Sequence, residues 1–221
     1  YLRNEGFLEV ETPTLQTVYG GANATPFVTH HKALDQNFYL RISNELYLKR
    51  LIAGGFDAVF EFVKDFRNEG IDRTHNPEFS ALEFYQAYVD YNEIMRHTEN
   101  ICERCAIAVN GSTITEYEGR TFDLKAPWPR LSMLDAINKL GGIPFENLSD
   151  TEVQNLLNEK GWELDADYNR GLATQLVFEE TCETQLIQPT FITDHPKETS
   201  PLCKQNRENP DLLERFEAYI N

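Results

Sequence analysis

The sequence has no apolar stretch long enough to cross a membrane. A membrane-spanning helix needs about twenty consecutive apolar residues, and no run in these 221 residues approaches that length. No secretory signal peptide opens the sequence, and Tyr1 is not an initiator methionine, so we expect the true N-terminus to lie upstream. The lack of a long apolar run predicts a protein without membrane contact.

Cysteine is scarce, with four residues at positions 102, 105, 182 and 203. Only Cys102 and Cys105 are close together, and no second close pair completes a four-ligand zinc site. Both fall in a helix that we predict over residues 91–108, where a three-residue spacing places side chains on one face. The pattern favours reduced thiols over zinc or disulfide chemistry and predicts a cytoplasmic protein.

Basic residues are few, because 20 Lys and Arg stand against 36 Asp and Glu, a formal net charge of −16. Non-specific binding to nucleic acid depends on basic side chains that neutralise phosphates, so the charge argues against strong RNA binding by this segment alone. The composition is otherwise that of a soluble globular protein, with 41% hydrophobic and 25% charged residues. A chain of this length buries a real core, as one large domain or as a domain with an insertion.

The most informative stretch runs from Phe60 to Tyr91, and its pattern predicts two strands joined by a long charged loop. The strands cover about residues 59–66 and 78–88. Hairpin loops usually have about two to five residues, and a longer loop is more often functional. From spacing alone, an aromatic-rich antiparallel sheet with a solvated loop is as good an interpretation as a binding site.

Side-chain alternation sorts this stretch into faces. The first strand places three aromatic rings on one side, namely Phe60, Phe62 and Phe66. The second strand has one face with a ring, a carboxylate and a phenol and another that is apolar, with Phe79, Glu83 and Tyr85 on the first and Leu82, Phe84 and Tyr88 on the second. The loop between the strands carries charged and polar side chains, namely Arg67, Glu69, Arg73, His75 and Asn76.

Strand and helix patterns continue on both sides of this stretch and predict an α+β fold. Before it we expect a helix end closed by Gly6, strands over 7–11 and 38–42, and a helix over 44–53 with Ser43 as its N-cap. After it we expect the 91–108 helix, a strand over 117–124 and three helices between about 131 and 186. Their signals are Ser132 as a cap, a Ser149–Glu152 capping box and a helical pattern over 171–185. Residues 213–220 alternate as a strand with Phe216, Ala218 and Ile220 on the apolar side.

Several segments together resemble the class II aminoacyl-tRNA synthetases, in the form typical of lysyl-tRNA synthetase. FRNEG followed by RTHNPEF and LEFYQAY is similar to motif 2 of that family, and FLEVETPTL resembles the end of motif 1. RISNELYLKR, the Gly20-Gly21-Ala22 turn and ERFEAYIN also resemble segments of the lysyl enzymes. One detail departs from the commonest form, because Thr74 stands where an arginine usually precedes the histidine and Arg73 is one place earlier.

The resemblance implies a fold and a domain arrangement. The fold is a class II synthetase-like antiparallel sheet flanked by helices, with a helical insertion at about residues 127–186. Residues 1–221 are then part of a catalytic domain, without the anticodon-binding domain and without the C-terminal segment that carries motif 3, since no G-x-G-x-x-R stretch occurs. Motif 1 implies a homodimer.

The resemblance also implies the activation of lysine by ATP to lysyl-adenylate, followed by transfer to tRNA(Lys). Arg67 is the expected catalytic residue, because its permanently charged fork bridges the lysine carboxylate and the α-phosphate. The resemblance assigns ATP to Arg67, Glu69, His75, Asn76 and Phe79, and lysine to Gly21, Glu45, Arg67, Glu83 and Tyr85. Within these sets Glu69 reads the adenine amino group, Phe79 stacks on the base, Glu83 takes the α-ammonium, and Glu45 with Tyr85 takes the ε-ammonium. Glu217 is the expected ligand of Mg²⁺.

Three other interpretations stay open at this point. One is a non-catalytic synthetase paralogue that acts as a binding module, and another is a related ligase that attaches a lysine derivative to a protein. The third is a synthetase for aspartate or asparagine, against which the Glu45 and Tyr85 pair indicates a cationic side chain.

Overall fold

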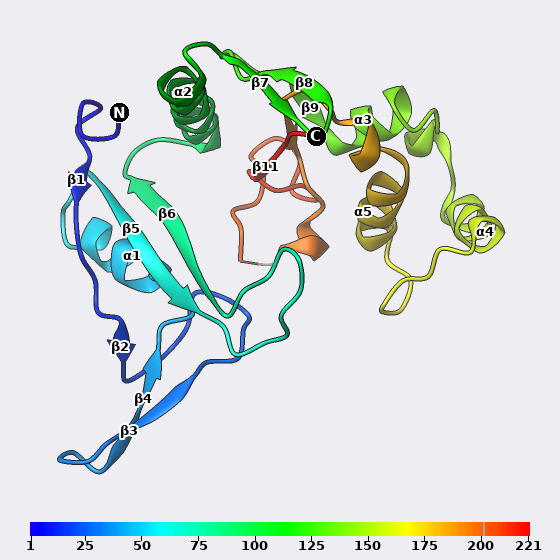
Figure 1. Cartoon of the computed structure of the whole chain (residues 1–221). Coiled ribbons are helices and arrows are strands. Elements are labelled where there is room, and N and C mark those ends of the chain that lie inside the picture. Colours follow the sequence, from blue (N-terminus) through cyan, green and yellow to red (C-terminus); the bar gives the residue numbers. More distant parts are fainter. Residues whose placement is uncertain (201) are drawn as a thin grey trace. The chain divides into compact units, whose positions relative to one another are not determined.

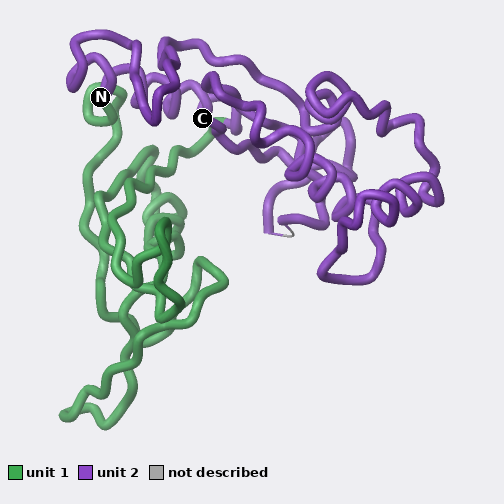
Figure 2. Tube along the Cα trace, turned by 45° about the vertical axis from the view of Figure 1, so that its right-hand side comes forward, with its two compact units in different colours: residues 1–89 green, residues 90–221 purple. Residues whose placement is uncertain are grey.

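The chain divides into two units, residues 1–89 and residues 90–221, and each unit is described by itself (Figure 2). The structure is a computed structural model that describes residues 1–200 and 202–221. Within these residues no helix is both long and apolar enough to cross a membrane.

The first unit is organised around a long antiparallel hairpin, β5 (Ala58–Phe66) and β6 (Glu78–Gln86) (Figure 1). Its register runs from Ala58 opposite Gln86 to Phe66 opposite Glu78, so the loop comprises residues 67–77. This confirms the predicted pair of strands and the long loop. The second strand ends earlier than expected, because Tyr88 has a φ of +61° and lies 99% exposed beyond it.

Two smaller sets of strands and one helix complete this unit. β1 (Leu8–Glu9) pairs in parallel with β5, which gives the order β1-β5-β6. A second sheet has the order β2-β4-β3, and helix α1 follows it; their bounds are β2 (Leu15–Gln16), β3 (Val28–His31), β4 (Gln36–Leu40) and α1 (Glu45–Ala53). The first unit therefore contains two three-stranded sheets, and the strands predicted over 7–11 and 38–42 are shorter or shifted toward the N-terminus.

Local hydrogen bonds define the structure at the start of the chain and at the N-terminus of α1. Residues 1–6 form turns rather than a helix, although Gly6 has the positive φ of a helix C-cap and the Phe7 amide bonds the Leu2 carbonyl. The N-cap position of α1 is Asn44 rather than Ser43, which corrects the prediction by one residue. The Ser43 hydroxyl still accepts the Glu45 amide hydrogen bond at 3.1 Å.

The two faces of β5 differ in burial. Phe60 is buried, but Phe62 on the same side is 70% exposed. The opposite face is the buried one, and it contains two carboxylates between its apolar side chains: Val59, Glu61, Val63 and Asp65.

The second unit begins with helix α2 (Tyr91–Asn110), which confirms the predicted helix and extends it by two residues. Cys102 and Cys105 lie in α2, and all four cysteines are free thiols. A two-stranded hairpin of β7 (Ile114–Tyr117) and β8 (Arg120–Asp123) follows where we expected one strand over 117–124. The reason is the Glu118-Gly119 turn, in which both residues have positive φ as in the tightest hairpins.

The largest core of the second unit is helical (Figure 1). Ser132 caps α3 and accepts the Asp135 amide at 3.1 Å, and the Ser149–Glu152 capping box opens α4, as predicted. The third helix ends four residues earlier than expected and continues as a short 3₁₀ turn, η2 (Glu183–Gln185). The helices are α3 (Met133–Lys139), α4 (Asp150–Lys160) and α5 (Arg170–Thr181), and two further 3₁₀ turns are η1 (Phe145–Asn147) and η3 (Lys197–Thr199).

In the sequence, these helices fall between two strands that are neighbours in one sheet. β9 (Arg130–Ser132) and β10 (Thr190–Thr193) pair in parallel, and β11 (Phe216–Tyr219) pairs antiparallel with β10. In β11 the expected apolar side is wrong in part, because Ala218 is exposed. Tyr219, expected opposite the apolar side, packs on the helical core with its ring 5.5 Å from that of Phe178.

Candidate functional site

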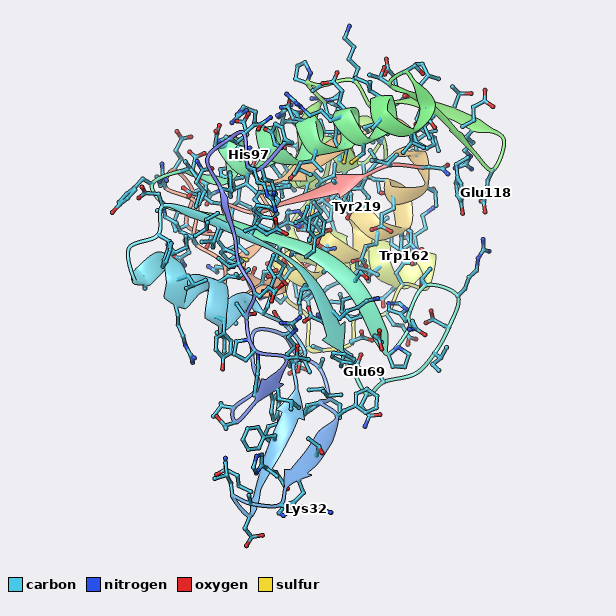
Figure 3. All side chains as sticks on the ribbon, turned by 60° about the vertical axis from the view of Figure 1, so that its left-hand side comes forward. Lys32, Glu69, His97, Glu118, Trp162 and Tyr219 are labelled. Carbon is cyan, nitrogen blue, oxygen red and sulfur yellow. The ribbon has the colours of Figure 1, made fainter. Side chains whose placement is uncertain are left out.

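The loop of the β5–β6 hairpin and the start of β6 form a pocket of about 210 Å³. Its lining residues are Arg67, Glu69, Gly70, Thr74, His75, Asn76, Pro77 and Phe79, which include all five residues that we expected to bind ATP. Arg73 is not one of them, whereas Thr74 is. The volume is below the roughly 300–1,000 Å³ of pockets that enclose a whole drug-sized ligand, so this pocket has room for only part of such a ligand. Figure 3 shows Glu69 at the loop end of the hairpin.

Arg67 stands at the mouth of the loop and is held by the backbone on two sides. Its amide bonds the Pro77 carbonyl at 2.8 Å, and its Nε donates to the Ile42 carbonyl at 3.4 Å. The guanidinium carbon lies 5.1 Å from the centre of the Phe79 ring. The same pocket therefore contains a positive charge, from the Arg67 guanidinium, and an aromatic ring, from Phe79, on which a flat group can stack.

Asp72 shapes the loop, and sequence reasoning missed it. Its Oδ1 accepts the amides of Thr74 and His75, both at 2.8 Å, and the His75 Nδ1 lies 2.8 Å from Oδ2. These bonds, led by the Thr74 amide, lower the pKa of Asp72 to about 2. An Asp followed by a turn is the available sequence signal, because Asp side chains bond the backbone two residues ahead.

The remaining loop residues are tied to neighbouring backbone. Asn76 donates from Nδ2 to the Glu78 carbonyl. Glu69 accepts the Thr25 amide at 3.3 Å, and the Asn68 amide bonds the Thr25 carbonyl at 2.8 Å. The loop is therefore anchored to the segment around residue 25.

The residues that we expected to bind lysine also come together within the first unit. Gly21 has a φ of +90°, and a Cβ on it would lie 3.0 Å from the Ser43 hydroxyl and 3.1 Å from the Glu45 Cβ. Its backbone thus contacts the start of α1, where a side chain has no room. On β6 the Tyr85 hydroxyl donates to Glu83 at 3.2 Å.

Negative charge accumulates around Glu83. Burial raises the pKa of Glu83, the Tyr85 hydrogen bond opposes that rise, and the nearby carboxylates of Asp65, Glu45 and Glu61 add to it. Burial and the charges of Glu83 and Glu45 also raise the pKa of Tyr85, so its phenol stays a donor. Glu45 itself pairs with Lys49 one turn later at 2.5 Å. A cluster with this surplus of carboxylates favours a cationic ligand.

A buried ionic network lies beneath this cluster and was not predicted from the sequence. Arg41 contacts Glu61 at 3.3 Å and Asp65 at 3.4 Å, and all three side chains are almost fully buried. Glu61 also accepts the amide and hydroxyl of Thr12 at 2.9 and 2.7 Å and the Asn44 amide group at 2.7 Å. The signal in the sequence was the two-residue spacing that puts Glu61 and Asp65 on the same face as Val59 and Val63.

Glu217 lies on β11 in the second unit and is described there by itself. Its carboxylate pairs with Arg215 and accepts the Tyr219 hydroxyl at 2.9 Å, and the same hydroxyl reaches Glu183 at 3.3 Å. A half-buried carboxylate offers the oxygen ligand that Mg²⁺ prefers, so the residue type fits the expected ion. Across residues 1–200 and 202–221, no three His, Cys, Asp or Glu side chains gather as a ready metal site.

An anchored polar loop, an arginine over an aromatic ring and an acidic cluster thus all lie within residues 1–89. The chain matches the family described as tRNA synthetases class II (D, K and N) over residues 1–221, and it belongs to that family.

The curated relatives reported for comparison are all lysine–tRNA ligases. A lysine–tRNA ligase of Christiangramia forsetii is 53% identical over 220 residues, covering 100% of this chain and 39% of the relative. Lysine–tRNA ligases of Porphyromonas gingivalis and Clostridium novyi are 51% and 50% identical, covering 98% and 100% of this chain and 37% and 44% of the relatives. The chain therefore spans about two fifths of the length of the curated relatives it matches.

Proposed function

We propose that this chain is part of the catalytic domain of a lysine–tRNA ligase, which activates lysine with ATP and transfers it to tRNA(Lys). The observation that carries the proposal is the acidic cluster of Glu45, Glu83 and the phenol of Tyr85, next to a pocket that contains Arg67 and Phe79. The relatives' names support lysine over aspartate or asparagine, and tRNA over a protein acceptor.

In the first step the lysine carboxylate attacks the α-phosphorus of ATP, a P–O bond forms and pyrophosphate leaves. The attacking carboxylate is already ionised at neutral pH, so the step needs no general base. It needs alignment of two anions and neutralisation of their charge. In the second step a terminal ribose hydroxyl of tRNA takes the lysyl group, and AMP leaves.

Each site residue has a role in this scheme. Arg67 bridges the lysine carboxylate and the α-phosphate, and Phe79 stacks on adenine, whose amino group Glu69 accepts from. His75 and Asn76 hold the distal phosphates. Burial keeps the Tyr85 phenol protonated, and its oxygen accepts a hydrogen bond from the ε-ammonium beside Glu45. Glu83 takes the α-ammonium, and Gly21 leaves room for the amino acid.

Mg²⁺ supplies charge neutralisation at the phosphates when bound, and Glu217 would hold it from the protein side. Arg215 keeps the Glu217 carboxylate oriented in the free chain. We further propose that residues 127–186 are a helical insertion, since α3 to α5 lie between two adjacent strands of one sheet. A cytoplasmic homodimer formed through the segment that resembles motif 1 completes the proposal.

Pyrophosphate exchange tests the proposal directly. The full-length protein that contains this chain should incorporate labelled pyrophosphate into ATP with lysine and much less with aspartate or asparagine. Equal exchange with the three amino acids, or none with lysine, would remove the assignment.

The Glu45→Gln variant tests the substrate pocket within the same assay. A charge-assisted hydrogen bond contributes about 1.5–3 kcal/mol, so lysine specificity should fall roughly tenfold or more while the KM for ATP changes little. Glu116→Gln, on the exposed β7–β8 hairpin, is the matched control. Unchanged lysine specificity in Glu45→Gln would exclude Glu45 from the pocket.

A further inference from the structure

Glu61 is a buried carboxylate that joins three separate segments of the first unit. It is 3% exposed and accepts hydrogen bonds from Thr12, Arg41 and Asn44. Arg41, itself 5% exposed, is its counter-ion at 3.3 Å. A carboxylate withdrawn from water this far persists only when it is paired and its oxygens are bonded, so this arrangement fixes its partners in place.

The bond to Asn44 connects Glu61 to the lysine site. Asn44 is fully buried and stands at the N-cap position of α1, yet its side chain does not cap the helix. Instead its side-chain Nδ2 donates to Glu61 at 2.7 Å, while its backbone carbonyl accepts the Leu48 amide of the first turn at 3.1 Å. The residue after Asn44 is Glu45, so the helix that presents Glu45 begins at a residue that Glu61 holds.

The sheet gives Glu61 a second link to the same site. Glu61 lies directly opposite Glu83 in the β5–β6 register. Directly opposite side chains are about 4.5–5.5 Å apart at Cβ. One buried residue thus relates the strand that carries Glu83 to the helix that carries Glu45.

We propose that Glu61 is a positioning residue for lysine recognition, which acts through Asn44 and sets the spacing between Glu45 and Glu83. This inference deepens the proposed function and rests on it, because the two spaced carboxylates are assigned to the two ammonium groups of lysine. In this role Glu61 does not contact the substrate itself but fixes the positions of Glu45 and Glu83, which do.

Asn44→Ala is the sharpest test, because it removes the bond to Glu61 without removing a side-chain cap or changing charge. Loss of a bond to a buried carboxylate should raise the KM for lysine about tenfold, with less than about a twofold change in the KM for ATP. Thr12→Val removes a different donor to Glu61 and should raise the lysine KM in the same direction by less. Asn155→Ala, on the exposed face of α4, should leave both constants unchanged.

Hydrogen exchange on the same full-length variants gives a readout that does not depend on activity. In Asn44→Ala the amides of the first turn of α1 should exchange faster, while those of β5 and β6 stay protected. Equal changes in both KM values, or unchanged lysine KM with unchanged exchange in α1, would overturn the inference. If the wild-type protein shows no lysine-dependent exchange of pyrophosphate, the proposed function fails, and the amide exchange of α1 still decides whether Glu61 positions this helix.

Discussion

At the scale of one residue, the protonation state of Glu83 should make the proposed binding of lysine depend on pH. Burial and neighbouring carboxylates raise its pKa, and an ammonium ligand needs its ionised form. Lysine affinity should therefore be full above the raised pKa of Glu83 and fall as the pH decreases through it. An ordinary glutamate would lose its charge only at lower pH.

We expect the KM for lysine in the full-length enzyme to rise as the pH is lowered through the raised pKa of Glu83. Glu83→Gln should bind lysine about tenfold more weakly and lose this pH dependence. Steady-state kinetics at a series of pH values measures both effects. A wild-type profile that stays flat down to the pH at which the enzyme unfolds would contradict the assignment of Glu83.

Asp72 makes a second prediction, for the nucleotide side. Asp72→Asn keeps an Oδ1 for the loop amides but removes the negative charge and replaces the Oδ2 that faces the His75 ring with an amide group. Because His75 and Asn76 line the pocket, the loop should lose its shape and the KM for ATP should rise about three- to tenfold, the effect of one or two modest hydrogen bonds. The KM for lysine should stay near the wild-type value. Asp135→Asn, on an exposed face of α3, serves as the control.

The roles proposed for Arg67 and Phe79 predict effects on different kinetic constants. Arg67→Lys should lower the rate of adenylate formation at least about tenfold, because one ammonium does not replace a bidentate fork between two anions. Phe79→Ala should mainly raise the KM for ATP through lost stacking. Single-turnover and steady-state measurements on both variants separate the two effects, and the reverse pattern would show that the roles are exchanged.

Elements whose ends depend on local signals were predictable from the sequence. Ser132 and the Ser149–Glu152 box start their helices as expected, and Gly161 ends α4 in the left-handed region. The 11-residue spacing between the strands of the β5–β6 hairpin was also visible. The pattern of the 114–123 segment was misread because Glu118, a non-glycine residue, takes the positive φ of a tight turn.

The buried network was not predictable, because it depends on contacts between distant segments. Glu61 and Asp65 read as polar positions of a strand, and only tertiary contact with Arg41 explains their burial. The alternation that groups Phe60 with Phe62 also gives no sign that Phe60 is buried and Phe62 exposed. The candidate ATP and lysine residues came instead from resemblance, and the structure gathers the ATP set around one pocket.

The cap of α3 gives a prediction at the scale of an element. Ser132→Ala removes the hydroxyl that accepts the Asp135 amide at 3.1 Å. Loss of such a cap costs about 1 kcal/mol, and a domain of this size loses roughly 2–4 °C in Tm for that amount. The loss should lower the stability of the whole unit, because Met133, Ala136 and Ile137 of the same helix are fully buried in its core. Thermal unfolding against Ser112→Ala, a serine in an exposed turn, measures it; equal Tm values for the two variants would show that the cap contributes nothing.

The division into two units separates the candidate residues at the scale of the whole chain. Gly21, Glu45, the hairpin loop, Glu83 and Tyr85 all lie in residues 1–89, and Glu217 lies in residues 90–221. Amino-acid and nucleotide recognition can thus be tested by substitutions in one unit. The proposed metal role of Glu217 is tested separately, by the Mg²⁺ concentration that Glu217→Gln requires for half-maximal exchange, which should rise.

The net charge of −16 predicts weak binding of RNA by the 221-residue chain. Basic side chains that release counterions from phosphates supply non-specific affinity, with Kd values of about 10⁻⁴–10⁻⁶ M in proteins that bind nucleic acid. A chain with this surplus of carboxylates repels phosphates over most of its surface, so we expect a Kd for tRNA weaker than about 10⁻⁴ M at physiological salt. Because few counterions are released, the affinity should change little between about 50 and 200 mM salt. Fluorescence anisotropy of labelled tRNA with the 221-residue chain, next to the full-length protein, measures both quantities. Micromolar binding that falls steeply with salt would mean that a local basic surface of this chain outweighs its overall charge.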